Sequence, residues 1–160
     1  MMKKGLIAYF SASGVTARLA NTVAQATGGE LYEIKPTVPY TDRDLNWNDK
    51  GSRRSVEMND QAARPEMAAP AADIAEYDAI FVGFPIWWYE APRIIQTFLE
   101  SGDFSGKTII PFATSGGSGM GKIAEILKKS CPGAKVLSGK RFSASASVRE
   151  ISGWVNTLDV

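Results

Sequence analysis

Residues 6–16 read Leu-Ile-Ala-Tyr-Phe-Ser-Ala-Ser-Gly-Val-Thr, an apolar run that gives way to small hydroxyl residues around a glycine. The run predicts a buried strand over Leu6–Phe10, and Val15 and Leu19 begin the pattern of a helix. The intervening segment would lie at a helix N-terminus, where free backbone N–H groups and the helix dipole favour an anion. We therefore interpret residues 11–16 as a candidate phosphate-binding loop. The alternative is an ordinary strand–turn–helix corner in which Ser and Thr cap the helix.

The side chains of this loop suit an anion. Ser11, Ser13 and Thr16 offer hydroxyl donors. Gly14 lets the chain turn sharply, because glycine has no Cβ to restrict its backbone.

The composition is that of a soluble globular protein. The chain has 160 residues, of which 44% are hydrophobic and 22% charged, so we expect a single domain over residues 1–160. Its formal charge of +1 gives no reason to expect a nucleic-acid partner. The first apolar stretch is too short for a signal peptide, and none approaches the roughly 18 apolar residues of a membrane span. We expect a cytoplasmic protein, without a membrane partner, that is a monomer or a weak dimer.

Two residue types limit the chemistry. The chain has no histidine, which removes Ser-His-Asp catalysis, imidazole metal sites and the commonest general base. Its single cysteine, Cys131, excludes an internal disulfide and a thiolate metal cluster, and we expect it to be an inert structural thiol. The sequence therefore predicts no metal site and no catalytic side chain, so that any redox chemistry would come from a bound cofactor.

Strand and helix patterns alternate along the rest of the chain. Further strands are predicted over Glu30–Lys35, Tyr77–Phe84, Lys107–Ala113 and Ala134–Leu137, the last extending toward Phe142. Helices are predicted over Thr16–Thr27, from Pro92 to near Gly102, around Ile123–Leu127, and after Ser147, which forms a capping box with Glu150. This order predicts an α/β three-layer sandwich with a five-stranded, doubly wound parallel sheet. The one irregular stretch, Pro36–Asp73, is expected to contain a surface helix over Arg54–Ala63.

Two further loops are expected at the same edge of the sheet as the first. The third strand is followed by Pro85-Ile86-Trp87-Trp88-Tyr89-Glu90, and the fourth by Thr114-Ser115-Gly116-Gly117-Ser118-Gly119-Met120-Gly121. Ligands of such sheets bind beyond the carboxyl ends of the strands, so the three loops predict a ligand that joins a phosphate to a flat heterocycle. Alternatively, the aromatic residues pack under a neighbouring loop or form a protein interface, and the glycines make a flexible turn.

Several motifs resemble those of flavodoxins. Ser-Ala-Ser-Gly-Val-Thr is similar to the flavodoxin FMN phosphate loop, Ser/Thr-x-Ser/Thr-Gly-x-Thr. A short flavodoxin-like branch is marked by Pro-Ile-Trp-Trp, Thr-Ser-Gly-Gly-Ser-Gly and a stretch found here as Asp44–Trp47, Arg54–Met58 and Arg64-Pro65. The resemblance covers essentially the whole chain and implies FMN as the cofactor and the strand order 2-1-3-4-5.

The resemblance also implies which residues contact FMN. By this resemblance the FMN phosphate is held by Ser11, Ala12, Ser13, Gly14, Val15 and Thr16. The loop beside the isoalloxazine ring is formed by Pro85, Ile86, Trp87, Trp88 and Tyr89. The pyrimidine edge of the flavin is approached by backbone N–H groups of Thr114, Ser115, Gly116 and Gly117. Tyr40 and Trp47 are candidates to close over the site.

The chain departs from flavodoxins in two respects. Many flavodoxins have a glycine beside flavin N5, where this chain has Trp-Trp-Tyr, and bulky residues disfavour positive φ. Electron-carrier flavodoxins are also typically very acidic, unlike this chain. Both differences argue against a low-potential one-electron cycle.

Three functions remain open. The first is an FMN-binding electron-transfer protein that serves a redox partner protein or a small-molecule acceptor. The second is an NAD(P)H-dependent FMN quinone or nitro-compound reductase of the same fold. The third is a cofactor-free, receiver-like binding module, which the serines and tryptophans at the strand ends disfavour.

Overall fold

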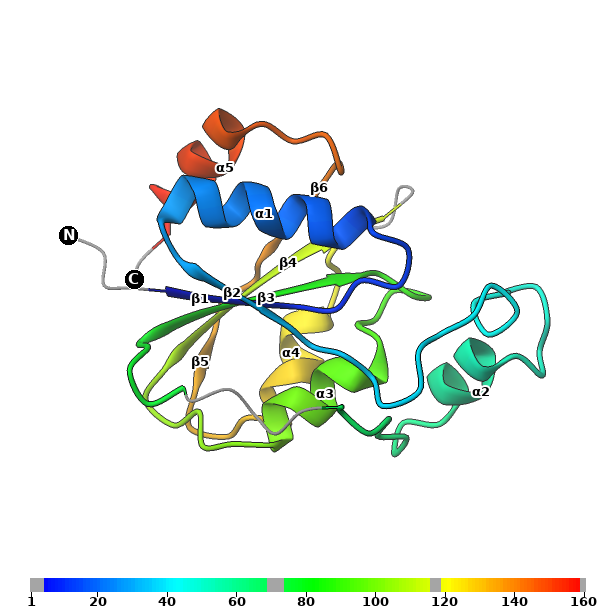
Figure 1. Ribbon diagram of the computed structural model, residues 1–160. Helices are drawn as coiled ribbons and strands as arrows, with labels where there is room; N and C mark the ends of the chain where they lie inside the picture. Colours follow the sequence, from blue (N-terminus) through cyan, green and yellow to red (C-terminus); the bar gives the residue numbers. More distant parts are fainter. Residues whose placement is uncertain (1–4, 69–73, 116–118, 159–160) are drawn as a thin grey trace.

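The computed structural model describes residues 5–68, 74–115 and 119–158 and shows a parallel sheet between two layers of helices (Figure 1). The sheet runs in the order β2-β1-β3-β4-β5, with strands β1 (Gly5–Tyr9), β2 (Glu30–Glu33), β3 (Ala79–Pro85), β4 (Thr108–Thr114) and β5 (Lys135–Val136). A further strand, β6 (Lys140–Phe142), also pairs with β4. The α/β class, the parallel sheet and the strand order are therefore as predicted.

The last predicted strand is divided into two. Strand β5 pairs with the start of β4, at Thr108 and Ile109, whereas β6 pairs with its end. Between them Gly139 takes a φ of +75°, and a Cβ built there would lie 2.3 Å from the carbonyl oxygen of Pro111. Because the backbone bends away at this glycine, two short strands share the fifth position of the sheet.

The helices cover the two faces of the sheet in pairs (Figure 1). Helices α1 (Val15–Thr27) and α5 (Val148–Val155) lie on one face, and α3 (Arg93–Glu100) and α4 (Ile123–Lys128) on the other. The strands serve both cores by alternation, since Ile80 and Val82 face α3 and α4 while Phe81 packs with α1 and α5. The predicted cap of the last helix is confirmed, because the Ser147 hydroxyl accepts a hydrogen bond from the backbone N–H of Glu150 at 3.1 Å.

Helix α2 (Arg53–Asn59) stands apart from the three layers, beyond the carboxyl ends of the strands (Figure 1). It begins one residue before, and ends four residues before, the predicted surface helix. It starts where the hydroxyl of Ser52 accepts a hydrogen bond from the N–H of Ser55 at 3.2 Å. Across the described parts of the chain, no helix has both the length and the apolar character needed to cross a membrane.

Candidate functional site

The three predicted loops meet at the carboxyl edge of the sheet. The N–H of Phe10 donates to Gly83 at 2.9 Å, and the N–H of Ile86 donates to Thr114 at 2.9 Å, so the ends of β1, β3 and β4 adjoin. A cavity of about 380 Å³ opens there and is lined by Ser13, Val15, Arg54, Pro85, Ile86, Trp87, Thr114, Ser115, Arg141, Ser143 and Ala144. We call it the central cavity.

The first loop presents the N-terminus of α1 to the central cavity. Gly14 is the N-cap residue, with a φ of +89°, a conformation that suits glycine. The helix has no side-chain cap and no acidic residue in its first turn. Its first N–H groups therefore have no cap acceptor, and Ser13 and Val15 line the cavity beside them. The loop is suited to hold an anion.

The other two hydroxyl residues of this loop have partners within the protein. The Ser11 hydroxyl accepts a hydrogen bond from the N–H of Gly14 at 3.0 Å. Thr16 is buried, and its hydroxyl lies 2.9 Å from that of Thr114 at the end of β4. Ser11 and Thr16 thus shape the loop and attach it to the sheet, while Ser13 is the one of the three hydroxyl residues that lines the central cavity.

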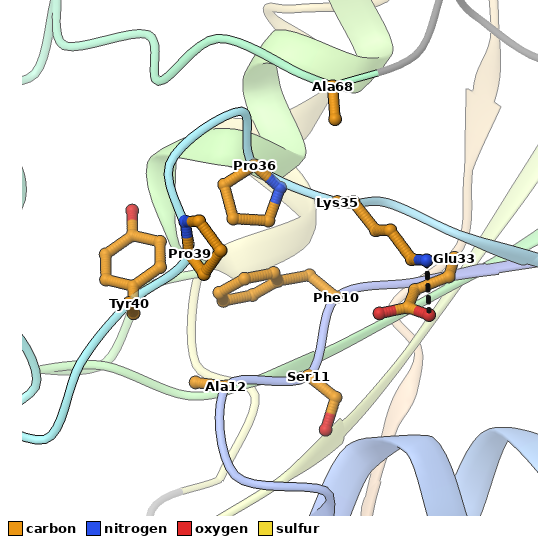
Figure 2. Close-up of a pocket in the computed structure, with 9 residues that line it drawn as sticks. All are labelled: Phe10, Ser11, Ala12, Glu33, Lys35, Pro36, Pro39, Tyr40 and Ala68. Atoms are coloured by element: carbon orange, nitrogen blue, oxygen red, sulfur yellow. Dashed lines mark ion pairs between the residues drawn. The ribbon is translucent and has the colours of Figure 1, made fainter.

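A second cavity, of about 360 Å³, lies on the β2 side of the loop (Figure 2). Ser11 and Ala12 line it, whereas Ser13 and Val15 line the central cavity, so the residues of the first loop are divided between two cavities. Figure 2 shows the ring of Phe10 in its wall and an ion pair at one end, in which Lys35 Nζ lies 3.9 Å from a carboxylate oxygen of Glu33.

The second loop contains a tight turn with an unusual backbone. Trp87 and Glu90 exchange two backbone hydrogen bonds, of 2.9 and 3.1 Å, across Trp88 and Tyr89. Trp88 has a φ of +48° and Tyr89 a φ of +66°, the signature of a type I′ turn. The expectation that these bulky residues would avoid positive φ is wrong. The paired hydrogen bonds close a two-residue turn, and the I′ geometry requires positive φ at both central positions.

The three aromatic residues of this loop differ in burial. Trp87 is buried, and its ring centroid lies 5.8 Å from that of Phe10 and 5.6 Å from that of Tyr40, in edge-to-face contacts. Trp88 is 40% exposed and Tyr89 72% exposed. Trp87 therefore forms part of the cavity wall and of the core, while Trp88 and Tyr89 leave aromatic surface accessible.

Tyr40 and Trp47 are not among the residues that line the central cavity. Tyr40 lines the second cavity, donates a hydrogen bond to the carboxylate of Glu57 and lies beneath the guanidinium of Arg53, 3.8 Å from its ring centroid. Burial raises the pKa of Tyr40, and the bond to Glu57 adds to this. Trp47 is 58% exposed and lines neither cavity. The ring of Tyr40 also packs edge-to-face on that of Phe10, with 5.6 Å between centroids, and so joins the irregular segment to the residue that follows β1.

Two arginines that line the central cavity were not predicted as site residues. The guanidinium carbon of Arg54 lies 4.7 Å from the ring centroid of Trp87 and 5.4 Å from that of Trp88. Arg141 donates to the hydroxyl of Ser115 at 2.9 Å and to its carbonyl at 3.1 Å. Arg54 stands in a stretch that carries the flavodoxin resemblance, whereas no motif marks Arg141.

The third loop is described in part. Thr114 is buried against Thr16, and Ser115 lines the central cavity. The predicted contacts of Gly116 and Gly117 lie outside the described residues. Within residues 5–68, 74–115 and 119–158, no group of three or more acidic, cysteine or histidine residues could hold a metal ion.

Comparison with known proteins identifies the class that this fold and site define. A family model described as flavodoxin matches residues 4–158, and the chain belongs to the flavodoxin family. No curated protein matches the chain in sequence.

Solved structures agree with this assignment. A candidate flavoprotein from Bacteroides eggerthii DSM 20697 is 48% identical, with a TM-score of 0.91 and 99% of each chain covered. A second, from Bacteroides uniformis ATCC 8492, is also 48% identical, with a TM-score of 0.86 over 98% of this chain and 100% of that one. A flavoprotein from Lactobacillus acidophilus NCFM, solved in complex with FMN, shares the fold at 24% identity, with a TM-score of 0.71 over 96% and 99% of the two chains.

Proposed function

We propose that the protein binds FMN in the central cavity and that the bound flavin accepts and donates electrons. One observation carries this proposal: the uncapped start of α1, the Trp87–Glu90 turn and the end of β4 meet around a single cavity. The family assignment and the FMN complex of the Lactobacillus flavoprotein support the choice of flavin.

The residues present suit FMN. The α1 N-terminus, without an acidic first turn, suits the phosphate, and the aromatic wall formed by Trp87 suits a flat ring. A volume of about 380 Å³ falls within the range of small-molecule sites.

Each part of the cavity has a task in this proposal. Ser13 and the first N–H groups of α1 bind the phosphate, and Trp87 with Pro85 orients the ring. The flavin supplies the electron chemistry when it is bound. None of the lining residues in the described part of the chain has a carboxylate, and the chain has no histidine, so these residues offer no general acid or base of either type.

Two destinations for the electrons follow from the same site. We favour an electron carrier that serves a redox partner protein or a small-molecule acceptor. The alternative, an NAD(P)H-dependent quinone or nitro-compound reductase, gains support from Arg54 and Arg141, because NAD(P)H is an anion. Steady NAD(P)H oxidation by the pure FMN-loaded protein in the presence of a quinone would establish the reductase, and its absence would favour the carrier.

Flavin fluorescence quenching tests the cofactor directly. The apoprotein should bind FMN much more tightly than riboflavin, which lacks the phosphate. The Ser13→Ala variant should weaken FMN binding by at least about tenfold, since a hydrogen bond to a charged group contributes about 1.5–3 kcal/mol, and should leave riboflavin binding unchanged. Failure to take up FMN, or equal affinity for FMN and riboflavin, would overturn the proposal.

A further inference from the structure

The lining of the central cavity is positively charged, although the chain as a whole is close to neutral. Among the described residues, its lining includes Arg54 and Arg141 and no Asp or Glu. The formal charge of the whole chain is +1. Two cationic side chains are therefore concentrated at one small site, where they favour an anionic ligand.

The two arginines belong to different ends of the cavity. Arg141 lies on β6 and bonds to Ser115, next to Thr114, which in turn contacts Thr16 in the first turn of α1. Arg141 is thus at the phosphate end. Arg54 comes from α2 and lies over the rings of Trp87 and Trp88, at the end proposed for the flavin ring.

Arg54 differs from neighbouring arginines in that no carboxylate of the described residues pairs with it. Arg53 pairs with Glu57 at 3.0 Å, and Arg93 pairs with Glu90 at 2.9 Å. Within the described residues Arg54 forms no ion pair, its Nε is buried without a hydrogen-bond partner, and its Nη1 reaches a single carbonyl at 3.4 Å.

The charge of Arg54 persists in this setting. Partial burial lowers the pKa of Arg54, but an arginine remains protonated near neutral pH. An unpaired, partly desolvated guanidinium at the rim of a cavity is a strong site for a carboxylate or a sulfonate.

We propose that Arg54, together with the accessible face of Trp88, forms a subsite for a planar aromatic anion, the class of small molecule that reacts with the flavin. The guanidinium would bind the carboxylate or sulfonate, and the exposed ring of Trp88 would contact the ring of the ligand. This inference rests on the proposed FMN site, and it names the substrate class that the site accepts.

A matched pair of ligands tests the subsite without any redox reaction. Isothermal titration calorimetry of the oxidised, FMN-loaded protein should show 2-naphthoate binding at least tenfold more tightly than its neutral analogue 2-naphthamide. Arg54→Gln should abolish this preference, and Arg54→Lys should retain part of it. Arg43→Gln removes the same charge from an exposed residue of the same segment that does not line the cavity, and it should retain the full preference.

The outcomes separate this inference from the proposed function. If the unmodified protein takes up no FMN, the proposed function fails before the subsite is tested. If FMN binds but naphthoate and naphthamide bind equally, or if the preference survives Arg54→Gln, the subsite is refuted. If Arg54→Gln weakens FMN binding but not riboflavin binding, and leaves the naphthoate preference intact, Arg54 serves the phosphate and the inference is again refuted.

Discussion

Replacing Tyr89 by glycine should stabilise the protein, although the change removes a whole aromatic side chain. Tyr89 has a φ of +66° in the type I′ turn and is 72% exposed. A left-handed backbone costs a non-glycine residue about 1–2 kcal/mol, and so exposed a ring contributes little burial to offset it. At Tyr89 the energy lost to backbone strain is therefore larger than the energy gained by burying the ring.

The comparison that isolates this strain is Tyr89→Gly against Tyr89→Ala. Both variants lose the ring, but only glycine adopts positive φ without a steric penalty. We expect the free energy of unfolding of Tyr89→Gly to exceed that of Tyr89→Ala by about 1 kcal/mol. With a urea m-value of about 1–3 kcal/mol/M, this corresponds to a rise in midpoint of about 0.3–1 M, measured on the apoprotein.

A control at a second exposed residue should change in the opposite direction. Val38 is 62% exposed and is not among the non-glycine residues with positive φ, so Val38→Gly should be less stable than Val38→Ala by about 0.5–1 kcal/mol. If Tyr89→Gly proves no more stable than Tyr89→Ala while the Val38 pair behaves as expected, the turn is not strained, and the reasoning fails.

Two further predictions concern stability. Gly139→Ala should lower the free energy of unfolding by about 2–4 kcal/mol, because the new Cβ would lie 2.3 Å from the carbonyl oxygen of Pro111 at a φ of +75°. Gly153→Ala in helix α5 has open space around the new Cβ and should stabilise slightly. Equal effects of the two substitutions in urea unfolding would contradict this prediction. The hydrogen bond from Arg64 lowers the pKa of Glu100 in the folded protein. The ionised Glu100 therefore adds to the stability of the fold above its unfolded pKa near 4.5, and this stabilisation is lost as the pH falls below that value. Stability of Glu100→Gln should therefore fall less steeply than that of the unmodified protein over this acidic range, and parallel curves would exclude the effect.

The fold could be predicted because its signals are local. Apolar runs such as Leu6–Phe10 mark strands, and the spacing of Ile94, Ile95, Phe98 and Leu99 marks a helix whatever the rest of the chain does. The division of the last strand at Gly139 depends on the backbone of Pro111 on the neighbouring strand, and this contact has no signature in the local sequence.

The candidate site was likewise predictable only where it depends on local signals and on the topology of the sheet. Loops at the carboxyl ends of β1, β3 and β4 must meet in a doubly wound sheet, so the sequence alone predicts that Ser13, Trp87 and Ser115 lie at one site. The same reasoning does not place Arg54 and Arg141 in the candidate site. Arg54 lies in a segment that follows no regular strand–helix alternation, and its place over Trp87 depends on contacts between distant parts of the chain.

One residue that links these distant parts is Arg93, whose side chain is almost completely buried at the start of α3. Its guanidinium donates to the carbonyl of Met58 at 2.9 Å, near the end of α2, and to the carboxylate of Glu90 at 2.9 Å, the residue that closes the turn with Trp87. One buried cation thus ties the helix that carries Arg54 to the turn over which Arg54 lies. Since a buried guanidinium without acceptors is very costly, these bonds resist independent movement of the helix and the turn. The helix that carries Arg54 and the turn over which Arg54 lies are therefore held together, which keeps the backbone of Arg54 close to the rings of Trp87 and Trp88.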